Sequence, residues 1–318
     1  MSALAYRHQR VQRLRRLLGR RSARKEEGRF VLEGANLLEE ALAAGTQIEA
    51  VFVDQDWTAG RSPSLNALGG AGEGGAGLLA LEEDGASAAT PVSRIASLLE
   101  RCFETGARVF ELESGVMARV AGTVSPQPLM AVVPVPAHDL GSVRAASPRL
   151  VVVCVDVRDP GNAGTVVRSA WAAGVDAVIC CEGTVDMWNP KAVRSSAGAV
   201  LHVPIVQVGS PVEVLTELGE WGLVRWGTAV DAGTDYACAD LAQPCALVVG
   251  NEAGGLPVDD MAGVLDGVLN IPMPGGAESL NVGMAAAVIC FEAARQRRLG
   301  HGGAGWPVSF TGPGKGAS

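Results

Sequence analysis

Asn162 and Arg168 lie six residues apart in the stretch 155–174, VDVRDPGNAGTVVRSAWAAG. An apolar strand ends at about Asp156, a turn follows, and we expect a helix to start near Gly164. Such a junction presents free main-chain N–H groups to an anion or a ligand. Arg168 would lie about one turn into this helix, where the helix dipole disfavours a cation. We therefore expect Arg168 to serve something other than helix stability, the alternative being a plain surface arginine.

A second set of candidate residues follows an apolar strand in LVVGNEAGGLP, residues 247–257. The strand delivers Gly250, Asn251 and Glu252 at its carboxyl end, the edge at which open α/β sheets bind ligands. Glycines in this stretch allow the main chain a close approach or a positive φ. Glu252 is a candidate for chemistry, and a helix cap or turn residue is the alternative.

The third set lies in NIPMPGGAESLNVGMAAAVICFEAARQRR, residues 270–298, where a polar, irregular loop runs directly into an apolar helix. Ser279 and Asn281 fall at the helix start, and either one can serve as its N-cap. A cap explains one of them, but not both together with the Pro-Gly-Gly bend. We therefore expect this loop to do more than connect two elements.

Basic side chains occur in two places. In WNPKAVRSSAGA, residues 188–199, Lys191 and Arg194 accompany two serines at a strand–loop–helix corner, which suits phosphate. Residues 1–29 carry a net charge of +8, whereas the rest of the chain carries −16. Within that stretch apolar residues recur at helical spacing: Val11, Leu14, Leu17 and Leu18.

This pattern predicts a basic, amphipathic helical arm that binds a polyanion such as RNA. Its predicted contacts are Arg13, Arg16 and Arg24. A solvated helical face and a mitochondrial transit peptide are the alternatives, the second being weaker because the arm is nearly free of serine.

Composition indicates a globular protein of two domains. The chain has 318 residues, of which 48% are apolar and 19% charged. It shows no signal peptide and no apolar run that spans a bilayer. Seven cysteines without a C-x-x-C pair indicate free thiols in the cytoplasm. The four histidines show no ligand spacing, so we predict no metal site.

The pattern of apolar residues changes near residue 149. The runs RLVVVCVD, DAVICC and CALVVG are nearly continuous apolar strands separated by helical segments, which indicates a parallel sheet covered on both faces. We predict a basic arm at 1–29, followed by a small α/β domain at 30–135 with a Gly-rich insert at 58–90. A linker at 136–148, a large α/β domain at 149–300 and a disordered tail at 301–318 complete the predicted organisation.

In this order, the stretches N162-A-G-T-V-V-R168, G250-N-E-A-G-G-L256 and I271-P-M-P-G-G-A-E-S-L-N-V282 resemble the three motifs of the SpoU (TrmH-like) branch of SPOUT RNA methyltransferases. Residues 5–134 more loosely resemble the L30e-like substrate-binding domain of ribosomal-RNA members. The resemblance implies a C-terminal trefoil-knotted domain that binds S-adenosylmethionine and forms a homodimer. It implies these catalytic residues: Arg168, Asn162, Glu252, Ser279 and Asn281. It implies these donor-binding residues: Gly250, Asn251, Ile271, Met273, Gly275 and Leu280.

The implied reaction is methyl transfer to a ribose 2′-hydroxyl, with 23S ribosomal RNA as the favoured substrate. Transfer RNA, an antibiotic-resistance ribosomal methylation and a non-catalytic RNA-binding or assembly role are the alternatives. A nucleotide-dependent oxidoreductase is disfavoured, because the turn at Gly161 and Gly164 lacks the third glycine of G-x-G-x-x-G. We also considered a pairing of Glu252 with Arg168 that would hold the guanidinium in place.

Overall fold

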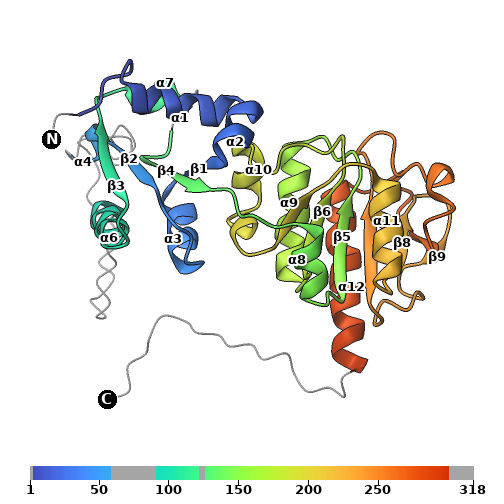
Figure 1. Ribbon diagram of the computed structural model, residues 1–318. Helices are drawn as coiled ribbons and strands as arrows, with labels where there is room; N and C mark the ends of the chain where they lie inside the picture. The colour runs from blue at the N-terminus through green and yellow to red at the C-terminus, as the bar shows by residue number, and fades with distance from the viewer. Residues whose placement is uncertain (1–2, 59–90, 122–125, 301–318) are drawn as a thin grey trace, which may run out of the picture. The chain divides into compact units, whose positions relative to one another are not determined.

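The computed structural model describes residues 3–58, 91–121 and 126–300 (Figure 1). The predicted insert from residue 59 onward and the predicted tail at 301–318 lie outside these residues. The chain forms two compact units, residues 1–137 with 186–202, and residues 138–185 with 203–318. Each unit is built around its own sheet.

The second unit contains a seven-stranded sheet in the order β7-β6-β5-β10-β8-β11-β9, in which every pair of neighbours is parallel. The strands are β5 (Leu150–Cys154), β6 (Ala177–Cys180), β7 (Ile205–Gln207), β8 (Val224–Thr228), β9 (Thr234–Asp235), β10 (Cys245–Val249) and β11 (Gly267–Asn270). All residues of β5, β6 and β10 are buried, which is why these strands read as continuous apolar runs. The predicted α/β class with a mostly parallel sheet is confirmed.

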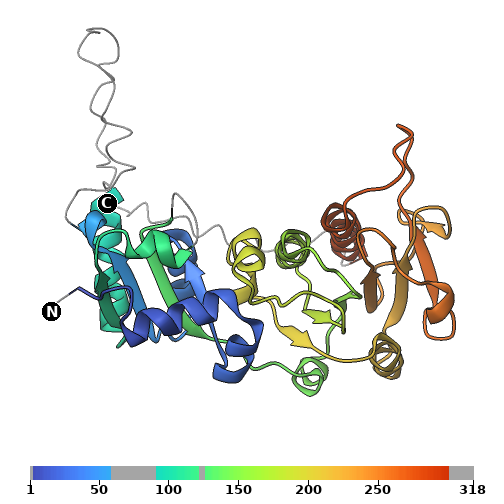
Figure 2. The same ribbon diagram turned by 90° about the horizontal axis from the view of Figure 1, so that it is seen from above.

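Helices cover both faces of this sheet (Figure 2). One face carries α9 (Pro160–Ala172) and α12 (Val282–Gly300), which pack closely on each other. The other carries α8 (Leu140–Ala145) and α11 (Pro211–Glu220), and a short 3₁₀ turn, η2 (Asp259–Met261), precedes β11. After β11 the chain returns past β8 to place α12 against α9 and β10, the course expected of the trefoil knot. The knot itself stays a prediction.

The first unit contains a four-stranded sheet in the order β1-β4-β2-β3, with β2 and β3 parallel and the other pairs antiparallel. Its strands are β1 (Arg29–Glu33), β2 (Ala50–Asp54), β3 (Arg108–Leu112) and β4 (Leu129–Pro134). Its helices are α1 (Gln9–Gly19), α2 (Arg21–Glu27), α3 (Ala35–Ala43), α4 (Gln55–Thr58), α6 (Pro91–Glu104), α7 (Val116–Ala121), α10 (Pro190–Ser195) and the 3₁₀ turn η1 (Ala199–Leu201).

The basic N-terminal segment belongs to the core of this unit. The apolar stripe of α1, made of Val11, Leu14 and Leu17, is fully buried against the sheet and α7. The predicted amphipathic helix is therefore confirmed, but it is packed against the sheet and is not a separate arm.

Residues 186–202 also pack in the first unit, whereas the sequence pattern predicted that they belong to the domain 149–300. The ring of Trp188 lies 4.9 Å from that of Phe30, centroid to centroid. Asp186 forms an ion pair with Arg24 in which Nη2 and Oδ2 are 2.6 Å apart, and both side chains are buried. A segment that follows β6 in the chain thus completes the core of the N-terminal unit.

Candidate functional site

The site lies in the second unit, where β5 and β10 end side by side. Val249 and Cys154 are partners in the parallel register, so the chain leaves both strands at the same edge of the sheet. The third motif reaches the site through α12, whose first turn packs on α9. A Cβ at Gly283 would lie 2.8 Å from Cγ2 of Thr165, so this close approach of the two helices requires glycine.

Helix α9 begins earlier than predicted, at Pro160 and not near Gly164. Asp159 caps it by accepting the N–H of Asn162 at 2.9 Å, and proline occupies the first helical position. Arg168 therefore lies in the middle of α9, and the dipole argument for its role is wrong. The Asp-Pro pair was the signal that identifies the true start.

One hydrogen-bonded chain joins the three motifs. Glu252 accepts the Asn162 side-chain N–H at 3.1 Å, and Asn162 Oδ1 accepts from Asn281 Nδ2 at 2.7 Å. Asn281 also caps α12, because its Oδ1 accepts the N–H of Gly283 at 2.9 Å. Three predicted site residues from distant parts of the sequence are thus brought together, and each is held by protein groups.

Glu252 is held as a carboxylate by main-chain donors. It accepts the N–H of Asp159 at 2.9 Å and that of Arg158 at 3.1 Å. Burial favours the neutral acid, but these hydrogen bonds and that from Asn162 outweigh it and lower the pKa of Glu252 below its usual value. Its contribution to stability is therefore present above the pKa of the unfolded chain and is lost as pH falls through the lower, folded pKa. Glu252 makes no pair with Arg168, so that idea is wrong.

We expect Glu252→Gln to slow the reaction at this site by roughly 10-fold or more, because an amide offers one acceptor oxygen where Glu252 uses two to accept three N–H groups. The amide N–H of the new side chain would face other donors. Activity measured beside the exposed control Glu220→Gln on α11 tests this, and equal activity of the two variants contradicts it.

Asn251 and Gly250 shape the turn after β10. The Asn251 side chain donates to the Asp156 carbonyl at 2.9 Å and accepts the N–H of Ala253 at 2.9 Å. A Cβ at Gly250 would lie 2.4 Å from the main-chain nitrogen of Leu256, so this position admits only glycine without a shift of the loop. The side chain of Asn251, predicted to bind a cofactor, is thus occupied in holding the loop.

The loop between β11 and α12 is mostly exposed, with Ile271 and Met273 half-buried, and has few internal hydrogen bonds. Within the described chain, the only main-chain hydrogen bond between groups of residues 271–280 runs from Gly276 N–H to the Met273 carbonyl, at 3.0 Å. The other predicted donor-binding residues of this loop, Ile271, Gly275 and Leu280, lie in the same open stretch. Its remaining N–H and C=O groups are available to a ligand.

Arg168 and Ser279 differ from the other three predicted catalytic residues. Both are exposed, and neither side chain makes a hydrogen bond or ion pair in the part of the chain that the structure describes. They are not joined to the chain of hydrogen bonds from Glu252 to Asn281. Their polar groups are therefore free to meet a substrate.

The residues predicted to bind RNA all lie in the first unit and differ in availability. Arg16, Lys191 and Arg194 are exposed, although Arg16 pairs with Glu27 and Arg194 with Glu33. Arg13 is half-buried and pairs with Glu27 and Glu49. Arg24 is buried, and its guanidinium donates to Asp186 and to the Leu17 carbonyl at 2.6 Å. The prediction for Arg24 is wrong, because a core ion pair uses its charge. Among the basic residues of α2 and the preceding turn, Arg20, Arg21 and Lys25 are exposed.

Sequence reasoning missed Asp156 and Arg158. Asp156 has a left-handed φ of 55° and accepts both from Arg158 Nε, at 2.8 Å, and from Asn251. A Cβ at Gly183 would lie 2.5 Å from Asp156 Oδ1, so a glycine here provides the space that this turn needs. An aspartate directly after a buried strand is the available signal, since aspartate tolerates this conformation.

We also searched the described residues for a metal site, a membrane-spanning helix and paired cysteines. Among residues 3–58, 91–121 and 126–300, no His, Cys, Asp or Glu cluster is arranged to hold a metal ion. No described helix is both long and apolar enough to cross a bilayer. All seven cysteines are free thiols, and six of them are buried.

Two family models match the chain. The SpoU rRNA Methylase family matches residues 149–291, and the MRM3-like substrate binding domain matches residues 8–131. The chain is 38% identical over 188 residues to the 23S rRNA (guanosine(2553)-2′-O)-methyltransferase RlmP of Bacillus subtilis, covering 59% of this chain and 73% of the relative. It is 36% identical over 185 residues to the 23S rRNA (uridine(2479)-2′-O)-methyltransferase of Streptomyces viridochromogenes, covering 55% and 63%.

Solved structures resemble this chain over most of its length. A crystal structure of an RNA 2′-O ribose methyltransferase has a TM-score of 0.70 at 30% identity, covering 93% of this chain and 99% of the other. The SpoU methyltransferase AviRb of Streptomyces viridochromogenes, in complex with AdoMet, has a TM-score of 0.69 at 28% identity, covering 91% and 99%.

Proposed function

The chain belongs to the SpoU rRNA methylase family, and on that premise we propose that it transfers a methyl group from S-adenosylmethionine to a ribose 2′-hydroxyl of 23S ribosomal RNA. The observation that carries this proposal is the convergence of all three motifs through the hydrogen bonds of Glu252, Asn162 and Asn281. RlmP and the Streptomyces viridochromogenes methyltransferase act on 23S rRNA, which favours ribosomal over transfer RNA.

The residues present fit the methyl donor. The exposed loop 271–280 offers unpaired main-chain groups, and the glycine turn at Gly250 brings a second main-chain segment to the same edge of the sheet. S-adenosylmethionine, when bound, supplies a methyl group on a sulfonium. Ile271, Met273, Gly275 and Leu280 would hold it through main-chain contacts. Gly250 and Asn251 would support the site from the other side.

Arg168 is the residue that we assign to the substrate hydroxyl. Arginine stays protonated in proteins, so it acts as a cation and not as a base. Placed beside the ribose, the guanidinium lowers the pKa of the 2′-hydroxyl and binds the adjacent phosphate. Ser279 contributes its free hydroxyl to the same substrate. Glu252, Asn162 and Asn281 are positioning residues, because their side chains are held by the protein.

The first unit would select the RNA. Its match to a substrate binding domain agrees with this role, and exposed basic residues of its N-terminal helices supply the phosphate contacts. Its buried thiol Cys102 and those of the second unit suit a reducing cytoplasm.

A homodimer through α9 and α12 completes the proposal. Large apolar side chains are exposed on these two helices, at 42%, 61% and 51% for Trp171, Met284 and Phe291. We expect Phe291→Arg to halve the mass measured by sedimentation equilibrium, because a cation would be buried in the apolar interface. Val212→Arg, on α11 at the opposite face of the sheet, should leave the mass unchanged. Equal masses for Phe291→Arg and the wild type contradict this interface.

Transfer of labelled methyl groups into separated, unmodified 23S rRNA and transfer RNA tests the function. We expect label in 23S rRNA, located at a ribose 2′-oxygen. Label confined to transfer RNA, or calorimetry that detects no binding of S-adenosylmethionine, overturns the proposal in favour of a transfer-RNA enzyme or a non-catalytic factor.

A further inference from the structure

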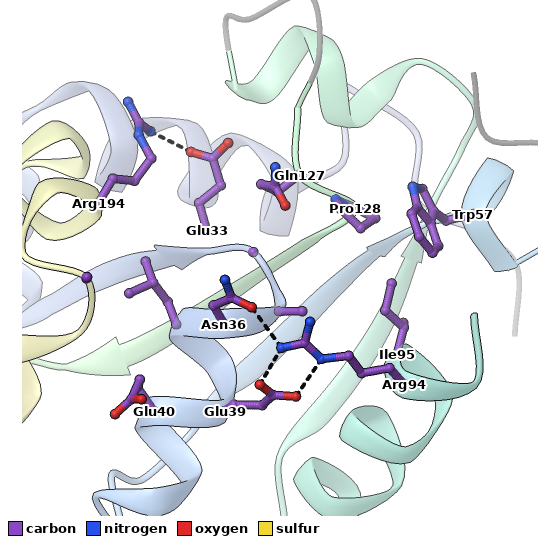
Figure 3. Close-up of a pocket in the computed structure, with 14 residues that line it drawn as sticks. Glu33, Asn36, Glu39, Glu40, Trp57, Arg94, Ile95, Gln127, Pro128 and Arg194 are labelled. Atoms are coloured by element: carbon purple, nitrogen blue, oxygen red, sulfur yellow. Dashed lines mark hydrogen bonds and ion pairs between the residues drawn. The ribbon is translucent and has the colours of Figure 1, made fainter. Parts of the chain in front are cut away.

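A pocket of about 910 Å³ lies in the first unit, beside the N-terminal end of α3 (Figure 3). Trp57 of α4, Ile95 of α6 and Pro128 before β4 gather at one end and make it apolar. Arg194 and Ala197 complete the wall from the segment 186–202. A volume of this size accepts a small organic ligand such as a nucleotide.

Both arginines that line the pocket are paired, and a third carboxylate of the lining, Glu40, contacts His202. Arg94 binds both carboxylate oxygens of Glu39, and Arg194 donates to Glu33 at 2.5 Å. Neither cation is left over to attract a polyanion by charge alone. Recognition in this pocket must therefore depend on shape, stacking and hydrogen bonds.

Neutral donors and acceptors are available for such recognition. Gln127 makes no hydrogen bond within the described residues, and its amide can both donate and accept. Helix α3 starts at Ala35, and its N-cap residue Gly34 provides no side-chain cap, so the N–H groups of its first turn are free for a phosphate oxygen. A Cβ at Gly34 would lie 3.2 Å from Cγ of Gln127, so the amide rests directly on this turn.

We propose that this pocket takes one unpaired nucleotide of the RNA substrate, with its base against Trp57 and its phosphate at the first turn of α3. An aromatic surface beside amide groups is how proteins bind bases that are not stacked in a duplex. The inference rests on the proposed function only in taking RNA as the substrate. It adds a site for recognition that lies in the first unit and is distinct from the site of methyl transfer.

The test measures binding of the full chain to a short single-stranded RNA of random sequence and to a fully paired duplex of the same strand length. We expect Trp57→Ala to weaken single-strand binding on the order of 10-fold, with duplex binding unchanged. Trp57→Phe should restore most of the affinity, since a phenyl ring still stacks. Phe103→Ala removes an aromatic ring that is 73% exposed outside the pocket and should have no effect.

The salt dependence of RNA affinity distinguishes the contribution of the pocket from that of the exposed basic residues Arg20 and Arg21. Trp57→Ala should leave the slope of affinity against salt unchanged, whereas the double change Arg20→Gln, Arg21→Gln should flatten it. The pocket is contradicted if Trp57→Ala binds single strands like the wild type, or if it weakens duplex binding equally. If no RNA is methylated but the Trp57 effect persists, the pocket stands and the proposed function fails.

Discussion

Replacing Arg168 with alanine should slow methyl transfer by roughly 10²- to 10³-fold, because it removes the one group assigned to stabilise charge on the ribose oxygen. Binding of S-adenosylmethionine should stay close to that of the wild type, since the donor is held by the loop 271–280 and the turn at Gly250. Alanine is the best helix former, and Arg168 has no protein partner in the described chain, so α9 should remain intact.

Single-turnover transfer and calorimetry with S-adenosylmethionine measure the two effects separately. Arg168→Lys should recover only part of the rate, because lysine keeps the charge but loses the planar fork. Arg144→Ala, which removes an exposed arginine of α8, is the matched control. Loss of donor binding in Arg168→Ala would assign this residue to the methyl donor and overturn its assignment to the substrate hydroxyl.

Replacing Arg24 with methionine should lower the free energy of unfolding of the first unit by about 3 to 5 kcal/mol. The substitution leaves the Asp186 carboxylate buried without its cation, and it removes the donor that satisfies the Leu17 carbonyl. Asp186→Asn combined with Arg24→Met should recover part of the loss, because no uncompensated charge then remains and the amide oxygen can still accept from Trp188.

Urea denaturation followed by circular dichroism measures this change. Arg16→Met is the control, since Arg16 is 57% exposed and its pair with Glu27 lies at the surface, where such a change costs less than about 1 kcal/mol. Equal stabilities for Arg24→Met and Arg16→Met would show that the buried pair contributes little.

Local patterns in the sequence predicted much of this architecture. The stripe of Val11, Leu14 and Leu17 identified α1, and continuous apolar runs identified β5 and β10. The motifs also predicted that Asn162, Glu252 and Asn281 would meet, because each follows or caps an element at one edge of the sheet. These features depend on short-range spacing, which the sequence displays directly.

Features that depend on distant contacts were not predictable. Arg24 reads as one more arginine of a basic helix, and its partner Asp186 lies 162 residues further along the chain. The pattern of WNPKAVRSSAGA is the same whichever sheet it packs on. Two polar side chains can also belong to motifs that meet and still not touch, as Arg168 and Glu252 show. The main-chain donors of Arg158 and Asp159 bind the Glu252 carboxylate instead.

The docking of residues 186–202 affects the order in which the protein can fold during its synthesis. Domains generally fold as units, the N-terminal one first, as the chain leaves the ribosome. Here a nascent chain that ends at residue 137 still lacks Trp188, whose ring packs against Phe30, and Asp186, the counter-ion of Arg24. The first unit can therefore mature only after residue 202 has been translated, when β5, α9 and β6 of the other unit have already been synthesised.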